Sequence, residues 1–330
     1  MLALVLLSCD GTGSAADTPP GTTVAETGDP ASDSGADTAD TADAGDSFDP
    51  FSLAAEVSEA EIAATIQELQ AFGTRYTFSD GDEAAAAYLV GRFESLGLEV
   101  LRDPFVVDGE QVENLVAEVP GTVDASVVYV FSAHYDSTSN AAETDAPGAD
   151  DNASGVAAVL EAARVLSGRP LAYTAWFVLT GAEEQGSLGS AHLTEWMVEQ
   201  GVDARGVIAP DMIGYWPLGN DDAMDILGDP ASAALVADME AVANELGVPN
   251  QTWIDHQYCY GDDHTNFQNA GFPAITPMDC VEAHNVRGSE EETPHYHRTT
   301  DTIDTLNLGF TTRVAQVTTV TFATWVQPQR

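Results

Sequence analysis

One stretch of this chain, residues 134–155 (HYDSTSNAAETDAPGADDNASG), constrains the fold most. It follows an apolar, strand-like run at 126–133 (SVVYVFSA) and precedes a helical pattern at 156–166. In open α/β proteins, polar and glycine-rich segments that leave the carboxyl end of a strand are the usual places for ligands. The sequence therefore predicts an α/β fold with a ligand site in this segment.

The same segment carries side chains that bind metal ions. His134 and Asp136 lie one residue apart, so an extended backbone sends both side chains to the same side. Asp151 stands directly before Asn152, where the helix is expected to begin, and its neighbour Asp150 is expected to be a solvated or helix-starting carboxylate. An imidazole and carboxylates crowded at one strand end are unfavourable unless a cation is present. The spacing predicts a divalent metal site.

Acidic residues also follow two other predicted strands. The run 171–179 (LAYTAWFVL) is typical of a strand buried on both faces, and Glu183 and Glu184 come after it. Asp211 follows a strand predicted at 206–210. Further strands are predicted at 98–107, 113–119, 224–227 and 273–276, and helices at 58–69, 82–96, 189–199, 232–246, 263–271 and 308–325. Strands that alternate with helices imply a sheet covered on both faces, with some strands parallel.

The charge of the chain excludes one class of partner. Its 54 acidic residues outnumber its 10 basic residues, all of which are Arg, and the net charge is -44. Nucleic acid is therefore a poor partner, because phosphate binding needs a basic surface. A cationic peptide would be attracted, whereas the simpler interpretation is a solvated acidic surface. The sequence does not indicate an oligomeric state.

The first fifty residues differ in composition from the rest. Residues 1–9 (MLALVLLSC) are too short to span a bilayer and are typical of a signal-peptide core, although basic residues are missing. Their last four residues resemble a bacterial lipoprotein box, in which Cys9 is lipidated. Residues 10–50 contain no Lys or Arg and cannot bury enough apolar surface to fold, so a disordered acidic tether is expected. We predict a signal segment at 1–9, a tether at 10–50 and a globular domain at 51–330.

These features predict an exported protein, either a cell-envelope lipoprotein or a secreted one, that meets the membrane only through Cys9. In an exported protein, Cys259 and Cys280 can form a disulfide. Two free buried thiols are the alternative interpretation.

The number of strand-end ligands indicates more than one metal ion. Imidazoles and carboxylates without thiolates suit zinc, or with lower affinity manganese or cobalt. A catalytic zinc takes about three protein ligands, so the acidic residues exceed what one ion needs. Two ions that share a bridging carboxylate would use them. The residues concerned are His134, Asp136, Asp151, Glu183, Glu184, Asp211 and a later histidine.

Six sequence blocks occur along the chain in this order: HYD at 134–136, GADDNASG at 148–155, EE at 183–184, DMIG at 211–214, DH at 263–264 and HRTTDTID at 297–304. Together they resemble the successive motifs of the secreted dizinc aminopeptidases of peptidase family M28, the family of bacterial leucyl aminopeptidase and aminopeptidase Y. The resemblance covers about residues 57–325. It implies a three-layer α/β/α sandwich around a mixed, largely parallel sheet of about eight strands, so that 51–330 would be a dizinc peptidase domain.

The resemblance also implies a ligand set for two zinc ions. Asp151 would bridge the ions, His134 and Asp211 would complete one site, and Glu184 and His297 would complete the other.

The remaining roles follow from the same resemblance. Glu183 would be the general base that takes a proton from a metal-bound water and passes it to the leaving amine. Asp136 would orient His134. A tyrosine near the Asp-His block often stabilises the tetrahedral intermediate in this family, and Tyr258 and Tyr260 both compete for that substrate-binding role.

The implied function is a zinc-dependent aminopeptidase that removes N-terminal residues from peptides. The motifs do not decide which end of a peptide is read, so a carboxypeptidase is an alternative. Glutaminyl cyclase, a zinc transferase, shares similar HYDS and EE motifs, but residues 152–155 and 185–190 (QGSLGS) resemble the peptidases. A non-catalytic binding domain on the same scaffold would predict lost ligands, and every ligand position is filled.

Overall fold

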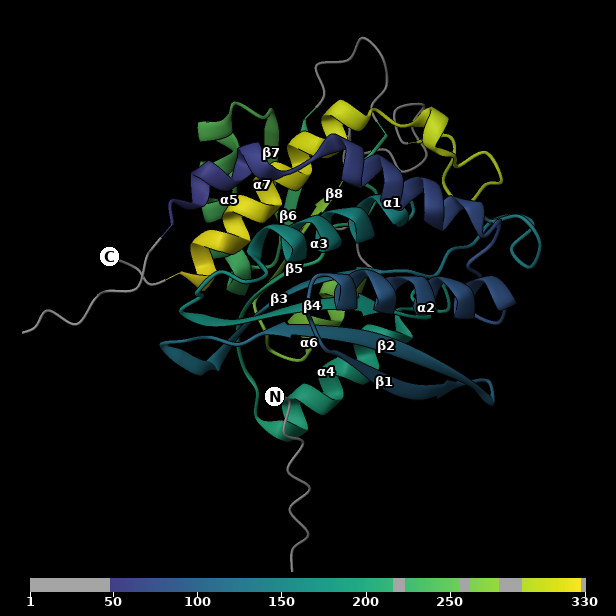
Figure 1. Cartoon of the computed structure of the whole chain (residues 1–330), viewed down its shortest axis with the longest axis horizontal. Helices are drawn as coiled ribbons and strands as arrows, with labels where there is room; N and C mark the ends of the chain where they lie inside the picture. Colours follow the sequence, from purple (N-terminus) through teal and green to yellow (C-terminus); the bar gives the residue numbers. More distant parts are fainter. Residues whose placement is uncertain (1–47, 216–222, 256–261, 279–292, 328–330) are drawn as a thin grey trace, which may run out of the picture. The chain divides into compact units, whose positions relative to one another are not determined.

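A single eight-stranded sheet organises the described part of the chain, which in this computed structural model comprises residues 48–215, 223–255, 262–278 and 293–327 (Figure 1). The strand order is β1-β2-β4-β3-β5-β8-β6-β7. The strands are β1 Val100–Val107, β2 Glu110–Val119, β3 Asp124–His134, β4 Tyr173–Thr180, β5 Asp203–Ile208, β6 Met224–Gly228, β7 Asn250–Ile254 and β8 Ala274–Met278.

The sheet is mixed, and its centre is parallel. Strands β4, β3, β5 and β8 pair in parallel, as do β6 and β7, whereas β1 with β2, β2 with β4, and β6 with β8 are antiparallel. Parallel neighbours end at the same edge of a sheet. The carboxyl ends of β3, β4 and β5 therefore lie side by side.

Helices cover both faces of this sheet, which confirms the predicted α/β/α sandwich (Figure 1). Helices α1, α2, α3, α5 and α7 pack on one face, and α4 and α6 on the other. The helices are α1 Glu59–Ala71, α2 Asp80–Ser95, α3 Ala153–Leu166, α4 Leu188–Gln200, α5 Ala233–Leu246, α6 Asp263–Asn269 and α7 Leu308–Val326, with 3-10 turns η1 Pro50–Glu56, η2 Pro230–Ser232 and η3 Ile303–Thr305.

Alternation along the central strands produces two cores. In β4, Phe177 packs in the core under α3 and α7, while its neighbour Val178 packs in the core under α4 and α6. In β3, Phe131 and Val130 divide in the same way. Successive strand residues point to opposite faces, so a strand buried on both sides must be apolar at nearly every position. This explains the continuous apolar runs in the sequence.

Helix α7 is buried although it is rich in threonine. The hydroxyls of Thr311, Thr312, Thr318, Thr321 and Thr324 each donate to the carbonyl four residues earlier. These bonds satisfy groups that would otherwise be buried without a partner. Among the described residues, no helix has the length and apolar character that a membrane crossing requires.

The predicted strands and α-helices all occur with shifted ends, and the structure adds strand β7 and the 3-10 turns η1, η2 and η3. Helix α2 begins at Asp80, two residues before its predicted start, because Ser79 accepts from the backbone N–H of Asp82 as its N-cap. Strand β5 begins at Asp203, three residues before its predicted start. Strand β7 was not predicted: it lies at the end of the strand order, and its side chains are exposed or half-buried. Such a strand carries little apolar pattern.

Candidate metal centre

Three neighbouring strand ends position the predicted ligands. His134 is the last residue of β3, Glu183 and Glu184 follow β4, and Asp211 follows β5. A backbone hydrogen bond from the Asp211 N–H to the Pro277 carbonyl (3.2 Å) extends the β5–β8 pairing up to that carboxylate. The structure therefore gathers at one sheet edge residues that are up to 77 positions apart in the sequence, since 211 − 134 = 77.

A first group of ligand atoms surrounds His134, whose side chain is almost completely buried. Its Nε2 lies 3.3 Å from Asp151 Oδ1 and 3.6 Å from Asp211 Oδ2. These three residues each offer one atom within 4.8 Å of the others. An imidazole and two carboxylates at this spacing match the ligand set of one zinc ion.

A second group shares Asp151 with the first. His297 Nε2 lies 3.2 Å from Asp151 Oδ2 and 3.1 Å from Glu184 Oε2. The two oxygens of Asp151 thus face different groups, Oδ1 toward His134 and Oδ2 toward His297. This is the geometry of a bridging carboxylate. The structure brings all five predicted ligands together in two groups that share Asp151. Their roles as ligands of two ions stay a prediction.

Unsatisfied buried atoms support cations in both groups. His134 Nε2, Asp211 Oδ1 and Glu184 Oε1 are buried and accept or donate no hydrogen bond within the described part of the chain. Buried polar groups are normally paired, so three unpaired atoms among the candidate ligands indicate missing partners. The donor set of nitrogen and carboxylate oxygen, without sulfur, fits zinc.

The charges of the groups lead to the same conclusion. Burial raises the pKa of Glu184 to about 8 and the pKa of Asp211 to about 6, and the charge of Asp151 adds to both shifts. Burial lowers the pKa of His297, but hydrogen bonds to Asp151 and Glu184 outweigh burial and raise it to about 10. Burial thus disfavours the charged forms of Glu184 and Asp211. A divalent cation beside them would favour those charged forms.

Asp136 holds the turn that carries the two glutamates. This fully buried carboxylate accepts from the backbone N–H of Glu183 through Oδ1 (3.0 Å) and from the backbone N–H of Glu184 through Oδ2 (3.2 Å). His134 Nδ1 lies 3.2 Å from the Asp136 carbonyl oxygen and 3.5 Å from Oδ1. The predicted orienting role for Asp136 agrees with these contacts, and the structure adds its hold on the Glu183–Glu184 turn.

Glu183 itself lies beside the first group. One carboxylate oxygen of Glu183, one ring nitrogen of His134 and one carboxylate oxygen of Glu184 all lie within 4.8 Å of one another. Glu183 Oε1 accepts from the Ser187 hydroxyl (2.8 Å). Burial raises the pKa of Glu183 well above its ordinary value, the positive charge of His134 opposes this, and the charges of Asp263 and Asp211 add to it.

Two residues outside the predicted ligand set support the segment that carries Asp151. Asp301 accepts from the backbone N–H of Asp150 (2.9 Å) and of Asp151 (3.1 Å). The expectation of a solvated Asp150 was wrong, because the residue is only 2% exposed. Its carboxylate accepts from the backbone N–H of Gly214 (2.7 Å) and of Tyr215 (3.1 Å). It therefore joins the Asp151 segment to the Asp211 segment. Asp301 lies in the HRTTDTID block, which was the available signal.

Arg75 holds the same segment from behind. Its side chain is 0% exposed and donates to the carbonyls of Tyr135 (2.8 Å), Pro147 (2.7 Å) and Gly148 (2.8 Å). The guanidinium fork thus ties both ends of the 135–148 loop together. A fully buried Arg in a chain with ten basic residues has no local sequence signal.

The Asp263–His264 block begins helix α6 behind the centre. Asp263 accepts from the Thr180 hydroxyl at the end of β4, and both residues are buried. Burial lowers the pKa of His264 to about 4, so its imidazole is neutral at pH 7.

The remaining predicted site residues, Tyr258, Tyr260, Cys259, Cys280 and Cys9, lie outside the described residues. A different tyrosine, Tyr296, stacks on His297 with ring centroids 3.7 Å apart and an interplanar angle of 28°. Burial raises the pKa of Tyr296, and the charges of Asp151 and Glu184 add to this shift.

Comparisons with known proteins place these features in context. A probable zinc metalloprotease of Pyrenophora teres f. teres (strain 0-1) is 28% identical over 322 residues, covering 81% of this chain and 66% of the relative. The chain therefore spans just under two thirds of that relative's length. The solved LapA aminopeptidase of Legionella pneumophila superposes with a TM-score of 0.73 at 22% identity, covering 85% of this chain and 75% of that one.

A protein with a different activity has the same fold. The glutaminyl cyclase of Fimbriiglobus ruber superposes with a TM-score of 0.67 at 21% identity, covering 83% of this chain and 96% of that one. At these identities, the two solved structures show the fold alone. The sequence model of peptidase family M28, by contrast, matches residues 114–321, which is more than half of the chain and includes every candidate ligand. The chain belongs to peptidase family M28.

Proposed function

We propose that the chain is a zinc-dependent metallopeptidase, and specifically an aminopeptidase that hydrolyses the N-terminal bond of peptides. One observation carries the proposal: Asp151 presents one oxygen to each of two ligand groups, and Glu183 lies beside them. The names of the fungal relative and the Legionella neighbour agree with this activity.

The residues divide between two ions and one base. His134, Asp211 and Asp151 would hold one zinc ion, and His297, Glu184 and Asp151 the other, with manganese or cobalt as substitutes. When bound, a pair of such ions lowers the pKa of an attacking water to about 7 and polarises the carbonyl of the scissile bond.

Glu183 is the proton carrier in this proposal. The turn that carries it is held by Asp136, and its Oε1 by Ser187. It accepts a proton from the attacking water and delivers that proton to the nitrogen of the leaving amine. The same carboxyl group can act in both steps because it takes up the proton in the first step and releases it in the second.

Two observations support cleavage at the amino end of a peptide. Arg75, the buried cation behind the centre, already donates to three carbonyls, so it is not free to bind the α-carboxylate of a substrate. The Legionella neighbour is named an aminopeptidase. An aminopeptidase is therefore favoured over a carboxypeptidase.

A substrate panel tests the proposal. Leucine p-nitroanilide and free peptides should be hydrolysed, their N-acetylated forms should not, a chelator should abolish the rate, and added zinc should restore it. Release of C-terminal residues from N-acetylated peptides would instead indicate a carboxypeptidase. Cyclisation of N-terminal glutamine would indicate a cyclase. A zinc-loaded protein that neither hydrolyses peptides at either end nor cyclises glutamine would be a binding domain.

A further inference from the structure

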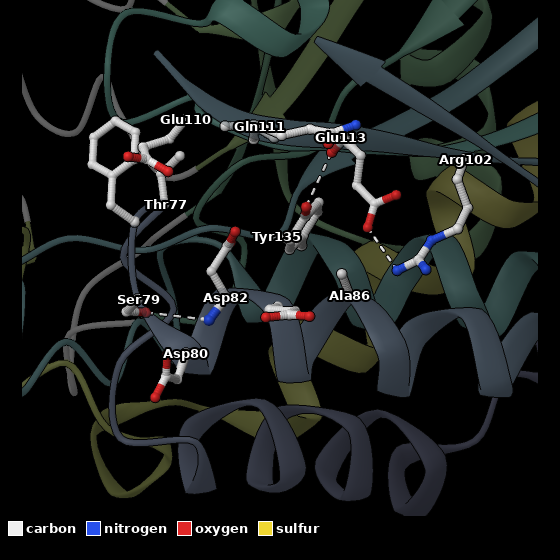
Figure 2. Close-up of a pocket in the computed structure, with 13 residues that line it drawn as sticks. Thr77, Ser79, Asp80, Asp82, Ala86, Arg102, Glu110, Gln111, Glu113 and Tyr135 are labelled. Atoms are coloured by element: carbon white, nitrogen blue, oxygen red, sulfur yellow. Dashed lines mark hydrogen bonds and ion pairs between the residues drawn. The ribbon is translucent and has the colours of Figure 1, made fainter. Parts of the chain in front are cut away.

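A second acidic pocket lies between the start of helix α2 and the β1–β2 hairpin (Figure 2). Its volume is about 720 Å³. Residues 77–80, 82 and 83 line one side, and residues of β2 with Arg102 of β1 line the other. None of the predicted metal ligands lines this pocket.

Asp82 is the residue that points to a ligand. Its side chain rises from α2 toward β2 in Figure 2, although the residue is only 7% exposed. Its Oδ1 is buried and has no hydrogen-bond partner within the described part of the chain. A buried carboxylate oxygen without a donor is costly, so an absent donor is the simplest explanation.

The acidic lining of the pocket favours a cationic ligand. Five carboxyl residues line it, namely Asp80, Asp82, Glu83, Glu110 and Glu113, and Arg102 is the basic residue among the lining side chains. Arg102 is already paired with Glu113 at 2.6 Å. The other four carboxyl groups have no basic counterpart in the lining, and a positively charged group would relieve their repulsion.

The spacing of these carboxylates suits an organic cation better than a metal ion. Three groups of described residues bring ligand atoms within 4.8 Å of one another, and none includes an acidic residue of this pocket. A divalent ion needs such convergent oxygens. Dispersed carboxylates instead match the several N–H donors of a guanidinium or ammonium group, and the half-exposed ring of Phe78 adds an apolar surface for an aliphatic stem.

The pocket is close to the candidate metal centre. Thr77 lines the pocket, and its hydroxyl lies 3.0 Å from Asp136 Oδ2, the oxygen that also accepts from the Glu184 N–H. The same hydroxyl contacts Gln185, which directly follows Glu184. The pocket therefore adjoins the side chains that hold the Glu183–Glu184 turn.

We propose that this pocket binds the guanidinium or ammonium group of a basic residue in the peptide substrate, downstream of the residue that is removed. The proposal rests on the proposed peptidase function for its substrate. The bound cation favours the ionised form of Asp82, whose carboxylate accepts from the N–H donors of the cation. The exposed Glu83 and Glu110 also line the pocket, and selectivity for basic peptides follows.

Direct binding tests the pocket without any catalysis. Agmatine, titrated into the zinc-loaded protein in a calorimeter, should bind, and Asp82→Asn should weaken its binding about ten- to hundredfold, the range for hydrogen bonds to a charged group. Glu94→Gln, at an exposed position near the other end of α2, is the charge-matched control and should bind as wild type does. If calcium or magnesium binds at Asp82 and agmatine does not, the proposal is wrong.

Kinetics then test whether the cation belongs to the substrate. Tetrapeptide amides that carry arginine at the second, third or fourth position are compared with the same peptides that carry neutral citrulline. At one position, kcat/KM should favour arginine about tenfold or more, mainly through KM, because the interaction is equal in the ground and transition states. Agmatine should compete with that peptide. Asp82→Asn should remove the preference, and Glu94→Gln should keep it.

Further controls distinguish three reasons for a negative result: a misfolded variant, a wrong proposed function and a wrong pocket assignment. The melting temperature shows whether Asp82→Asn folds, and Glu110→Gln, at an exposed pocket position, should lower the same arginine preference by a smaller factor. Agmatine binding without any peptide hydrolysis would overturn the proposed function and keep the pocket. Hydrolysis with equal rates for arginine and citrulline at every position, together with no agmatine binding, would overturn the pocket.

Discussion

Glu183 and Glu184 are neighbours in the sequence but meet different partners. Glu184 Oε2 lies 3.1 Å from His297, whereas Glu183 Oε1 accepts from Ser187. Glu184→Gln should therefore reduce zinc content and activity together, with partial rescue by added zinc. Glu183→Gln should keep both ions but lose about 10²–10⁴-fold in kcat, the usual size of a general acid–base contribution. Zinc analysis and steady-state rates of both variants decide between the roles.

The opposite pattern would reverse the assignment. Loss of zinc in Glu183→Gln with full zinc in Glu184→Gln would make Glu183 the ligand. A fully active Glu183→Gln variant would exclude the proposed proton transfer.

Asp151 links the two groups of ligands through its two oxygens. Asp151→Ala should therefore weaken the binding of both zinc ions. His134→Ala should mainly lower occupancy of the site with Asp211, and His297→Ala that of the site with Glu184. Elemental analysis at graded zinc concentrations measures each change. A wild-type protein that holds one zinc ion, unaffected by His134→Ala, would contradict the two-ion arrangement.

Asp82 should make stability depend on pH. Burial raises its pKa from 3.8 to about 9, the charge of Asp136 adds to the shift, Arg75 opposes it, and Glu113 adds to it. Because the folded pKa exceeds the unfolded one, the contribution of Asp82 to stability is complete below about pH 4 and is lost as the pH rises toward 9. The melting temperature of Asp82→Asn, relative to wild type, should thus rise between pH 5 and pH 9 without agmatine. A pH-independent difference would show that Asp82 titrates normally.

At the residue scale, the sequence indicates ligands better than their supports. His134, Glu184 and Asp211 follow apolar strands, and that pattern is visible without a structure. Asp301 supports Asp151 across 150 positions, and Asp150 differs from a solvated carboxylate only through its contacts with Gly214 and Tyr215. Long-range hydrogen bonds of this kind leave no local pattern. The role of each residue as a ligand stays a prediction until metal content is measured.

Among the structural elements, the loop at 135–148 depends on Arg75 more than on its own packing. Arg75→Lys keeps the charge but loses the planar fork that reaches the Tyr135, Pro147 and Gly148 carbonyls. Unsatisfied buried carbonyls cost about 1–3 kcal/mol each, so a clear fall in melting temperature is expected, with weaker zinc binding because the loop carries His134 and Asp151 at its ends. Arg205→Lys, at an exposed pair with Asp203, is the matched control and should change neither. Equal behaviour of the two variants would show that the fork is not needed.

Elements with a strong apolar pattern could be predicted from the sequence, and elements with a weak pattern could not. Strands β3 and β4 are buried on both faces and appear as apolar runs, and α1 begins at its predicted N-cap, Ser58. Strand β7 and the turn η1 lack such a signal, because most of their residues are exposed or half-buried. The order of strands in the sheet also needed the structure, since the parallel pairing of β5 with β8 joins residues more than 60 positions apart.

At the scale of the whole molecule, the net charge of -44 bears on the proposed preference for basic peptides. If that preference exists, long-range attraction should add to it over a distance set by the Debye length, about 8 Å at physiological ionic strength. The simpler interpretation of the charge is a solvated acidic surface. Export and lipidation at Cys9 stay predictions from the sequence, as does the disulfide between Cys259 and Cys280.

The boundary between tether and domain gives the last prediction. Residues 10–50 were predicted to be a tether, whereas η1, which begins at Pro50, packs on α7: Leu53 is 0% exposed, and Gln316 donates to the Ala54 carbonyl (3.0 Å). Deleting residues 1–47 should leave melting temperature and activity unchanged. Deleting residues 1–57 should cost about 2–5 kcal/mol, because it empties the space of a buried leucine.

Denaturant unfolding and peptidase rates of the two truncated proteins measure this difference. Unfolding of the shorter deletion would show that the predicted tether belongs to the folded domain. Equal stability of both deletions would show that η1 does not support α7. The first result would contradict the prediction from composition, and the second would contradict the packing of Leu53, so the pair of deletions tests the sequence and the structure separately.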